Sequence, residues 1–404
     1  MTGPTSFRAR AAWPLPLLLL LAVSRPVAAQ STQEESARQT PVFEVAPRGY
    51  VQFDWRGYPE WPIEPGGGRL QFDTFEIRRA RIGVDGRWRR LSFEVAVDPQ
   101  DVDDNTVLKD AYGQFRFSRA LRLRVGQFKL PGGREYLTSA RTIDFVERSA
   151  QSSSADAGRD VGGMLNGEIG KRFEYQVGLF AGDGRGRASR AGVTTAGRLT
   201  WAPVKDLEIG TSSSVGRTSA HDSDPANGLD GRMPSGYRFF DRLYVQGRRQ
   251  RFGIDATFTP GAWTIAAEGL RTSDQRLEQG LDLEDLPSVV ATGWSAAANH
   301  RFGRRRGGAR VRAREIDLGL RFDWLSFDDS AAATGRDSVR LRATDVRQRS
   351  AGTLTAGVSW QPTRWGRILG NASLERYGDA RSAPEPGKSG PYITLATRFQ
   401  IELP

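Results

Sequence analysis

The chain has 404 residues, no cysteine and a formal net charge of +11. Without cysteine, disulfide bonds and thiolate chemistry are excluded. The mean hydropathy is negative, at -0.50, and no stretch beyond residue 30 approaches the roughly 18 apolar residues of a membrane-spanning helix. A protein that crosses a membrane with helices is therefore excluded.

Residues 1–29 have the features of a secretory signal peptide. Arg8 and Arg10 precede an apolar run from Leu15 to Val23, and small residues occupy positions 27–29. The alternative is a retained membrane anchor, but the apolar run is too short to span a bilayer. We therefore expect export and cleavage after Ala29.

The mature chain is expected to start with a short polar periplasmic segment, residues 30–47, followed by one outer-membrane domain, residues 48–404. Three arginines and no acid precede Gln30, so cleavage lowers the net charge from +11 to +8. A sequence pI near 10.3 is typical of nucleic-acid binding. Export and the even spread of arginine along the chain argue against a nucleic-acid partner.

Apolar and polar residues alternate in many segments of the mature chain. Between residues 316 and 324, Ile, Leu, Leu, Phe and Trp alternate with Asp, Gly, Arg and Asp. Similar alternation covers residues 51–56, 91–97, 121–125, 173–179, 252–258, 354–360 and 393–401. A period of two over about 9 to 12 residues is typical of a tilted strand that crosses a bilayer.

Short turns alternate with long polar loops along the chain, as periplasmic turns and extracellular loops do in an outer-membrane barrel. The long loops are expected near residues 217–236, 273–288, 303–312 and 328–349. A soluble sandwich or a solenoid would share the alternation but would not need so many evenly long strands. Tryptophans end several strands, as an interfacial girdle requires (Trp55, Trp201, Trp324 and Trp360). The pattern predicts an all-β fold, a transmembrane antiparallel β-barrel.

The number of strands is sixteen or seventeen, depending on Tyr237 to Gly247, where the alternation is poor. Single-chain bacterial barrels have an even number of strands, so we predict sixteen and treat this segment mainly as a loop. From Pro131 to Gly158 the chain is rich in serine, glycine and charge over roughly 27 residues, too many for a hairpin turn. We expect this segment to fold into the lumen and narrow it.

Five segments between Phe72 and Ser149 follow one another in an order typical of one family. They are Ile77-Arg-Arg-Ala-Arg81, Lys109-Asp-Ala-Tyr112, Arg124-Val-Gly-Gln-Phe-Lys129, Leu137-Thr-Ser139 and Glu147-Arg-Ser149. This region resembles the phosphate-selective porin O and P family of Gram-negative outer membranes. A looser similarity covers residues 247–253, 263–270 and 352–360.

The resemblance implies a sixteen-stranded porin, usually a homotrimer, that passes small inorganic anions such as phosphate. It places Arg78, Arg79, Asp110 and Lys129 at the narrowest point of the pore. Residues of the long loop that are expected to donate hydrogen bonds to the anion are Arg134, Ser139 and Arg141. Further candidates in the lumen or at its mouth are Arg81, Arg122, Arg124 and Arg251.

Charge alone does not establish anion selectivity, because acids are at least as numerous as bases at the lumen-facing positions of the strands. The positive excess lies between Arg78 and Arg90 and in two arginine clusters, residues 304–306 and 310–314. These clusters either draw anions to the mouth or pair with lipopolysaccharide. Arg78, Arg79 and Arg81 cannot all face one way on a regular strand, so we expect either a β-bulge there or a register outside the apolar band.

No enzyme chemistry is indicated. The chain has only His221 and His300, and neither forms a zinc-ligand or Ser–His–Asp pattern with its surroundings. We expect no catalytic residue, no metal and no cofactor. Two functions of different classes remain: a passive porin, whether anion-preferring or non-selective, and a barrel plugged by its own loops with a structural or surface-binding role.

Overall fold

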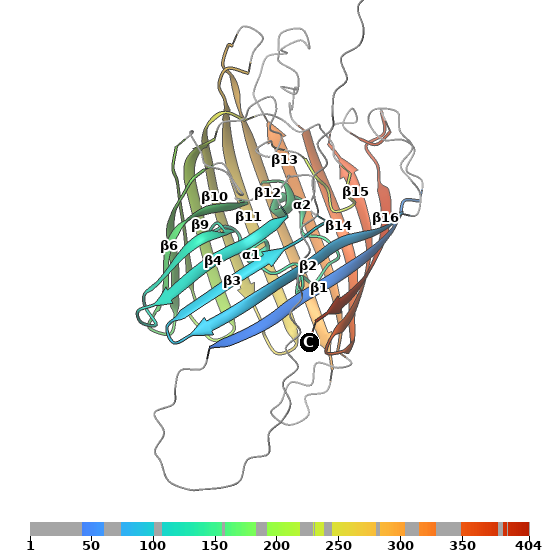
Figure 1. Ribbon diagram of the computed structural model, residues 1–404. Coiled ribbons are helices and arrows are strands. Elements are labelled where there is room, and N and C mark those ends of the chain that lie inside the picture. Colours follow the sequence, from blue (N-terminus) through green and yellow to red (C-terminus); the bar gives the residue numbers. More distant parts are fainter. Residues whose placement is uncertain are drawn as a thin grey trace, which may run out of the picture. The chain divides into compact units, whose positions relative to one another are not determined.

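The protein forms a closed antiparallel β-barrel of sixteen strands in the part of the chain that the computed structural model describes (Figure 1). That part comprises residues 43–59, 74–100, 107–155, 158–182, 192–218, 229, 231–237, 245–279, 283–303, 315–328, 349–378, 383–385 and 387–403. Each strand pairs with its neighbours in sequence, and β16 pairs with β1. The predicted fold class and strand number are confirmed.

The strands are β1 (Glu44–Gly57), β2 (Thr74–Trp88), β3 (Leu91–Val97), β4 (Leu108–Arg116), β5 (Arg122–Lys129), β6 (Arg159–Ile169), β7 (Phe173–Phe180), β8 (Thr194–Trp201), β9 (Leu207–Thr218), β10 (Gly247–Phe258), β11 (Trp263–Arg276), β12 (Leu286–Phe302), β13 (Glu315–Asp328), β14 (Arg349–Thr363), β15 (Gly366–Tyr377) and β16 (Tyr392–Glu402). Because β1 begins at Glu44, residues 44–47 belong to the barrel rather than to the polar segment expected before it. The signal peptide expected over residues 1–29 lies outside the described residues.

The alternation of the strands places apolar side chains outside the barrel and polar side chains inside it. On β14, Thr353 and Thr355 are fully buried, whereas Leu354 between them is 40% exposed. In a soluble sheet protein the leucine would be the buried residue, since burying it is what drives folding in water. The inverted pattern is that of a barrel whose outer face contacts lipid.

A buried ion pair closes the barrel at the seam between its first and last strands. Asp54 of β1 lies directly opposite Arg398 of β16. The guanidinium donates through Nε and Nη2 to the two carboxylate oxygens, both at 2.7 Å. Both side chains are fully buried, so each charge depends on the other for its stabilisation.

Successive connections of the barrel alternate between its two ends. The connections β2–β3, β4–β5, β6–β7, β8–β9, β10–β11 and β14–β15 share one end, here called the short-turn end. β12 ends at Phe302 and β13 begins at Glu315 at this same end. The prediction that residues 303–312 belong with the long loops of the opposite end is therefore wrong. Its length and its arginine-rich composition were misleading, because only the parity of the strands decides the end.

The arginine clusters at 304–306 and 310–314 fall in this connection, outside the described residues. The described strand ends on either side of it, Phe302 and Glu315, lie at the short-turn end. Lipopolysaccharide faces the extracellular loops of an outer-membrane barrel, at the end opposite to the short turns. The strand topology therefore gives no support to pairing between these clusters and lipopolysaccharide.

The segment between β5 and β6 contains two short helices, α1 (Arg134–Leu137) and α2 (Ala150–Ser154). Gln151 of α2 donates to Ser295 of β12 at 2.7 Å, and the Ala150 N–H donates to Asp323 of β13 at 3.0 Å. Since both acceptors lie on the polar inner face, the described part of this segment, residues 131–155 and 158, lies against the inner wall and is called the lumen loop. In the described part of the chain, no helix is long and apolar enough to cross a membrane.

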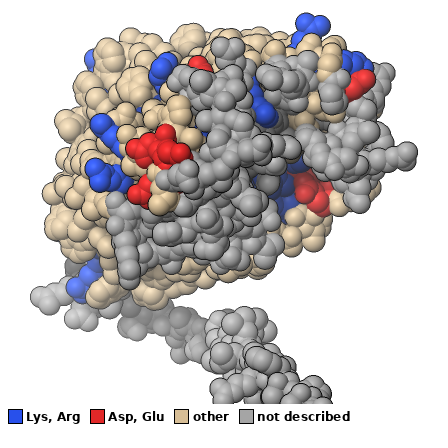
Figure 2. Space-filling model, turned by 90° about the horizontal axis from the view of Figure 1, so that it is seen from above, with Lys and Arg blue, Asp and Glu red and all other residues tan. Residues whose placement is uncertain are grey.

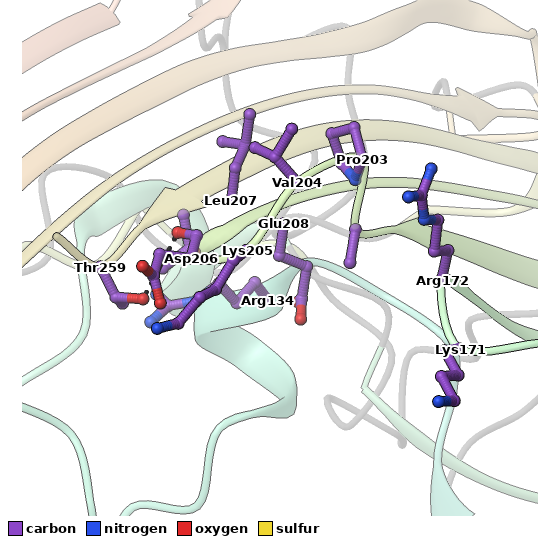
Figure 3. Close-up of a pocket in the computed structure, with 12 residues that line it drawn as sticks. Arg134, Lys171, Arg172, Pro203, Val204, Lys205, Asp206, Leu207, Glu208 and Thr259 are labelled. Carbon is purple, nitrogen blue, oxygen red and sulfur yellow. Dashed lines mark hydrogen bonds between the residues drawn. The ribbon is translucent and has the colours of Figure 1, made fainter.

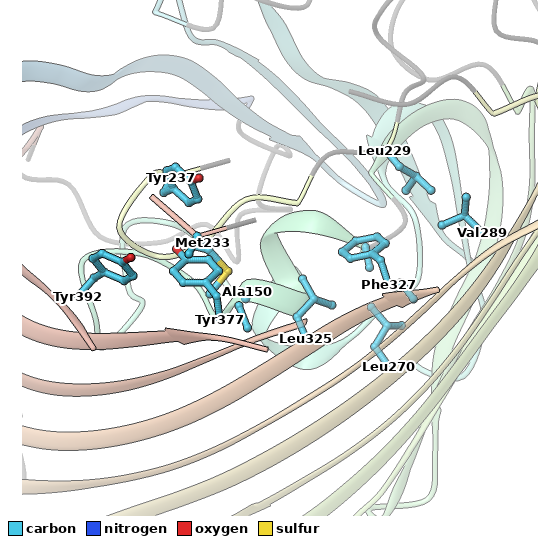
Figure 4. Close-up of a cluster of buried hydrophobic side chains, with 14 of the residues drawn as sticks. Ala150, Leu229, Met233, Tyr237, Leu270, Val289, Leu325, Phe327, Tyr377 and Tyr392 are labelled. Atoms are coloured by element: carbon cyan, nitrogen blue, oxygen red, sulfur yellow. The ribbon is translucent and has the colours of Figure 1, made fainter. Parts of the chain in front are cut away.

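A cluster of buried apolar side chains lies inside the barrel toward the end opposite to the short turns, here called the long-connection end (Figure 4). Leu325 and Phe327 of β13 are fully buried there, together with Met233 and Tyr237 of the β9–β10 connection. Ser235 of the same connection donates through its N–H and hydroxyl to Glu375 of β15, at 3.0 and 2.8 Å. This cluster, named here the inner apolar cluster, includes inward-facing residues of β11–β16.

The seam ion pair gives the first testable prediction. Replacing Arg398→Met should lower the free energy of unfolding by about 3–5 kcal/mol, because it leaves Asp54 buried without its main counter-charge. The double variant Asp54→Leu/Arg398→Met should recover most of this loss. Guanidinium unfolding in detergent, followed by tryptophan fluorescence, measures both. A double variant as unstable as the single one would show that the pair itself is net stabilising.

Candidate functional site

A single carboxylate anchors the lumen loop to the wall of the barrel. Oε1 of Glu147 accepts hydrogen bonds from Arg78 Nε at 2.7 Å, Arg56 Nη2 at 3.0 Å and Arg398 Nη2 at 3.2 Å. Oε2 accepts from Arg79 Nη2 at 3.4 Å. The four arginines come from β1, β2 and β16, so this contact, named the Glu147 clamp, joins the loop to three strands.

The clamp depends on an irregularity in β2. Gln52 of β1 pairs with Arg79, but the next residue, Phe53, pairs with Ile77. Arg78 is thus the extra residue of a β-bulge, which lets two consecutive side chains point the same way. Of the two alternatives expected from the conflict of parity, a β-bulge or a register outside the apolar band, the bulge is confirmed.

The Glu147 carboxyl remains ionised despite its burial. Burial by itself raises the pKa of this group, but Arg78, Arg79, Arg398 and Arg56 together hold it well below its usual value. In return, the carboxylate neutralises part of the positive charge of these arginines. Arg78 and Arg79 therefore face the interior as the resemblance implies, but they bind a carboxylate of the protein itself.

Lys129 and Asp110, the other two residues assigned to the constriction, also have partners within the protein. The Lys129 ammonium donates to the backbone carbonyls of Leu137 and Thr138, at 3.3 and 3.2 Å, and to that of Tyr136. Asp110 accepts from Nε and Nη2 of Arg159, both at 3.1 Å. Lys129 thus satisfies the carbonyls at the end of α1, and Asp110 pairs with β6.

Between the lumen loop and the strands β1–β7 lies a cavity of about 410 Å³, named the basic cavity. Its charged lining residues are Arg48, Arg81, Glu94, Asp110, Arg124, Lys129, Arg141 and Arg159. Six of these eight side chains are basic, and Ser139 adds a hydroxyl. Six of the predicted site residues thus meet in one place: Arg81, Asp110, Arg124, Lys129, Ser139 and Arg141.

Aromatic rings hold several of these cations in place. The Arg124 guanidinium lies 4.3 Å from the ring centre of Tyr112 and 5.3 Å from that of Phe128. Arg81 lies over the ring of Tyr50 at 5.7 Å, and its Nη2 is also 3.6 Å from the buried Asp98 carboxylate. A ring positions a cation without cancelling its charge, so Arg124 differs from the carboxylate-bound arginines of the Glu147 clamp.

The remaining predicted residues lie outside the basic cavity. Arg134 lines a cavity of about 570 Å³ at the short-turn end, beside Lys205 and Asp206 of the β8–β9 turn (Figure 3). Arg122 donates to Glu168 at 2.6 Å near the same end. Arg251 donates to the carbonyl of Ala155 at 3.1 Å, which supports the last turn of the lumen loop.

Two important residues were missed at the sequence level. Glu147 was noted only as part of a motif, and Arg159 not at all. The signal for Glu147 was available, since an acid in a loop that enters a lumen rich in arginine needs a basic partner. Arg159 is the first residue of β6, and only the strand register brings it beside Asp110.

The rim of the barrel carries charges of both signs. Figure 2 shows the long-connection end from above, and the described surface there carries both basic and acidic side chains. A rim of mixed sign does not by itself favour anions over cations. The asymmetry of charge that bears on selectivity is found inside, in the basic cavity.

The model of the phosphate-selective porin O and P family matches residues 63–401. The chain belongs to this family. It is thus an integral outer-membrane channel protein, and the family and the fold point to a channel rather than an enzyme. The family resemblance first seen between residues 72 and 149 is confirmed over most of the chain.

Solved porin structures share the fold of this porin at low sequence identity. The loop-L8 deletion mutant of OmpT from Vibrio cholerae has a TM-score of 0.57 at 10% identity, covering 89% of this chain and 99% of its own. The outer-membrane channel DcaP of Acinetobacter baumannii has a TM-score of 0.57 at 11% identity, covering 89% and 97%. Salmonella typhi OmpF, solved with daunomycin, has a TM-score of 0.53 at 10% identity, covering 89% and 97%. No curated protein sequence matches this porin.

The Glu147 clamp predicts how the lumen loop responds to pH and to mutation. A carboxyl group whose folded pKa is depressed contributes its full stability above the unfolded value of about 4.3, and this stability is lost progressively as the pH falls from there to the folded value. Hydrogen exchange of residues 131–155, corrected for intrinsic rates, should therefore be equally slow at pH 7 and at about pH 5.5, and should become faster as the pH falls below about 4. Glu147→Gln should speed exchange at pH 7 by about tenfold or more, since bonds to charged groups contribute ~1.5–3 kcal/mol.

Glu76→Gln is the matched control for this measurement. Glu76 lies 3.5 Å from the same Arg56, but its side chain is 44% exposed and belongs to β2 rather than to the loop. Its substitution should leave exchange in the lumen loop unchanged. Equal effects of the two substitutions would contradict the clamp.

Proposed function

We propose that this porin passes small oxyanions by passive diffusion through the basic cavity. The observation that carries the proposal is the excess of basic side chains in that cavity, six against two acidic ones. Charges in a narrow, partly dehydrated passage act more strongly on an ion than the same charges in open water. Excess positive charge at this point therefore favours anions.

Both acids of the cavity have basic partners of their own. Asp110 is bound by Arg159, and Glu94 is bound by Arg48 and accepts the Tyr112 hydroxyl at 2.7 Å. Arg124, in contrast, donates through Nε and Nη2 to the neutral amide oxygen of Gln114. The local charge thus stays positive even though the strands as a whole carry many acids.

Guanidinium groups suit an oxyanion because their planar donors match two oxygens at once. Arg141 of the lumen loop is the most exposed of the arginines described above, with 43% of its side chain accessible, and its nearest acid is Glu402 at 3.6 Å. Together with the Ser139 hydroxyl, it offers donors to phosphate or a related oxyanion. Assembly as a homotrimer, surrounded by outer-membrane lipid and lipopolysaccharide, is part of this proposal.

A plugged barrel is the second candidate function, and the inner apolar cluster favours it. Met233, Tyr237 and the α2 residue Ala150 pack with the inner wall of β11–β16, where a wide porin would hold water. In a plugged barrel the basic cavity would be a dead end. Conductance distinguishes the two candidates, since a plugged barrel conducts no ions.

The test is the reversal potential of the refolded porin in planar bilayers under a chloride gradient. The wild type should prefer anions. Arg141→Gln should lower the anion-to-cation permeability ratio by a factor of about 2–5, since one unit charge at a few ångströms contributes on the order of 1 kcal/mol.

Arg122→Gln is the control, because Arg122 lies outside the basic cavity and is paired with Glu168. It should leave the permeability ratio unchanged. A cation-preferring or unselective wild type would contradict the anion proposal. A folded barrel without conductance would favour the plugged alternative.

A further inference from the structure

One wall of the basic cavity is apolar and aromatic. Tyr50, Tyr112, Phe128 and Leu137 line it beside the cations. Tyr112 and Phe128 meet edge to face with their ring centres 5.8 Å apart. Phe128 is 1% exposed, so the pair is a rigid part of the wall.

Arg124 lies on this aromatic pair. Its guanidinium is 4.3 Å from the Tyr112 ring centre, and two of its nitrogens are fixed by Gln114, at 3.1 and 3.0 Å. The planar group is therefore held in one orientation while it lines the cavity. A guanidinium held on a ring can stack a second flat group on its opposite face.

The size of the cavity also bears on its ligand. At about 410 Å³ it falls in the range of roughly 300–1,000 Å³ that is typical of sites for organic molecules. An inorganic phosphate would use the donors but would leave the aromatic wall in contact with water. An anion that also carries a flat apolar body would use both.

We propose that the preferred anions of the basic cavity are aromatic carboxylates. The ring of the ligand stacks on the Arg124 guanidinium beside Tyr112, and its carboxylate accepts hydrogen bonds from Arg141 and the Ser139 hydroxyl. The proposal rests on the proposed function, because it names the class of anion that the same cavity takes. In this proposal Arg124 discriminates between aromatic and other anions, in addition to attracting negative charge.

The test compares benzoate, acetate, cyclohexanecarboxylate and inorganic phosphate as blockers of the chloride current through single channels. Benzoate should block at a concentration roughly tenfold lower than the others, because only its ring can stack on the guanidinium. Acetate lacks the ring, and cyclohexanecarboxylate has the apolar bulk without the flat face. If either blocks as well as benzoate, stacking is not the basis of recognition and the proposal is overturned.

Arg124→Lys tests the role of the planar group. Lysine keeps the charge but loses the plane, so the advantage of benzoate over acetate and cyclohexanecarboxylate should disappear. Arg122→Lys, on the same strand but outside the cavity, should retain that advantage. A benzoate preference that survives in Arg124→Lys would overturn the assigned role of Arg124.

The outcomes also distinguish this proposal from the one on which it rests. A wild-type channel without anion selectivity in chloride would contradict the proposed function as a whole. An anion-selective channel that phosphate blocks as well as benzoate does would leave the proposed function standing and overturn only the aromatic class of ligand. Resistance of the barrel to unfolding in detergent, measured for each variant, shows that its channel is folded.

Discussion

The interior of this barrel depends on one constraint: the backbone polar groups of the irregular lumen loop need hydrogen-bond partners inside the closed wall of strands. A backbone carbonyl that is buried without a donor costs free energy comparable to a lost hydrogen bond, and the lumen loop carries many such groups. Side chains of the wall supply the donors. Gln52 donates to the carbonyl of residue 140, Gln400 to that of residue 141 and Arg367 to that of residue 143, at 2.9–3.0 Å.

These donors come from β1, β16 and β15, and Arg321 of β13 adds a further one to the carbonyl of Glu147 at 2.9 Å. The loop is thus held to one arc of the wall by side chains that a slip of register would turn to the lipid face. The Glu147 clamp belongs to the same system, since its arginines come from β1, β2 and β16. The basic cavity lies between the loop so held and the strands β1–β7.

The sequence predicted the barrel well because a barrel wall has a simple rule. Inner and outer faces alternate, so Leu354 between Thr353 and Thr355 already shows which side meets lipid. The conflict of parity around Arg78 is visible in the sequence as well, but only the strand register shows that a bulge resolves it. The end at which residues 303–312 lie was misjudged from the length of the connection, although counting strands would have corrected it.

The partners that side chains find across the barrel could not be predicted from the sequence, because they depend on the strand register and on the path of the lumen loop. Asp110 meets Arg159 through β4, β5 and β6, and Glu147 meets Arg398 across 251 positions of the sequence. No local pattern encodes such pairs. This explains why the motif identified the right segments and yet assigned Arg78, Arg79 and Lys129 to the anion when each has an acceptor within the protein.

The effect of the lumen charges on ion selectivity likewise depends on which partner each charge has, and not on their total number. Counted over the whole barrel, acids and bases nearly balance at inward positions, which says little about selectivity. An ion responds to the charges near its path, because the field of a distant pair is screened within about 10 Å at 0.1 M salt. In the basic cavity Asp110 and Glu94 have basic partners, whereas Arg124 rests on rings and an amide. The rings matter for selectivity because they hold a cation in place and leave its charge free to act.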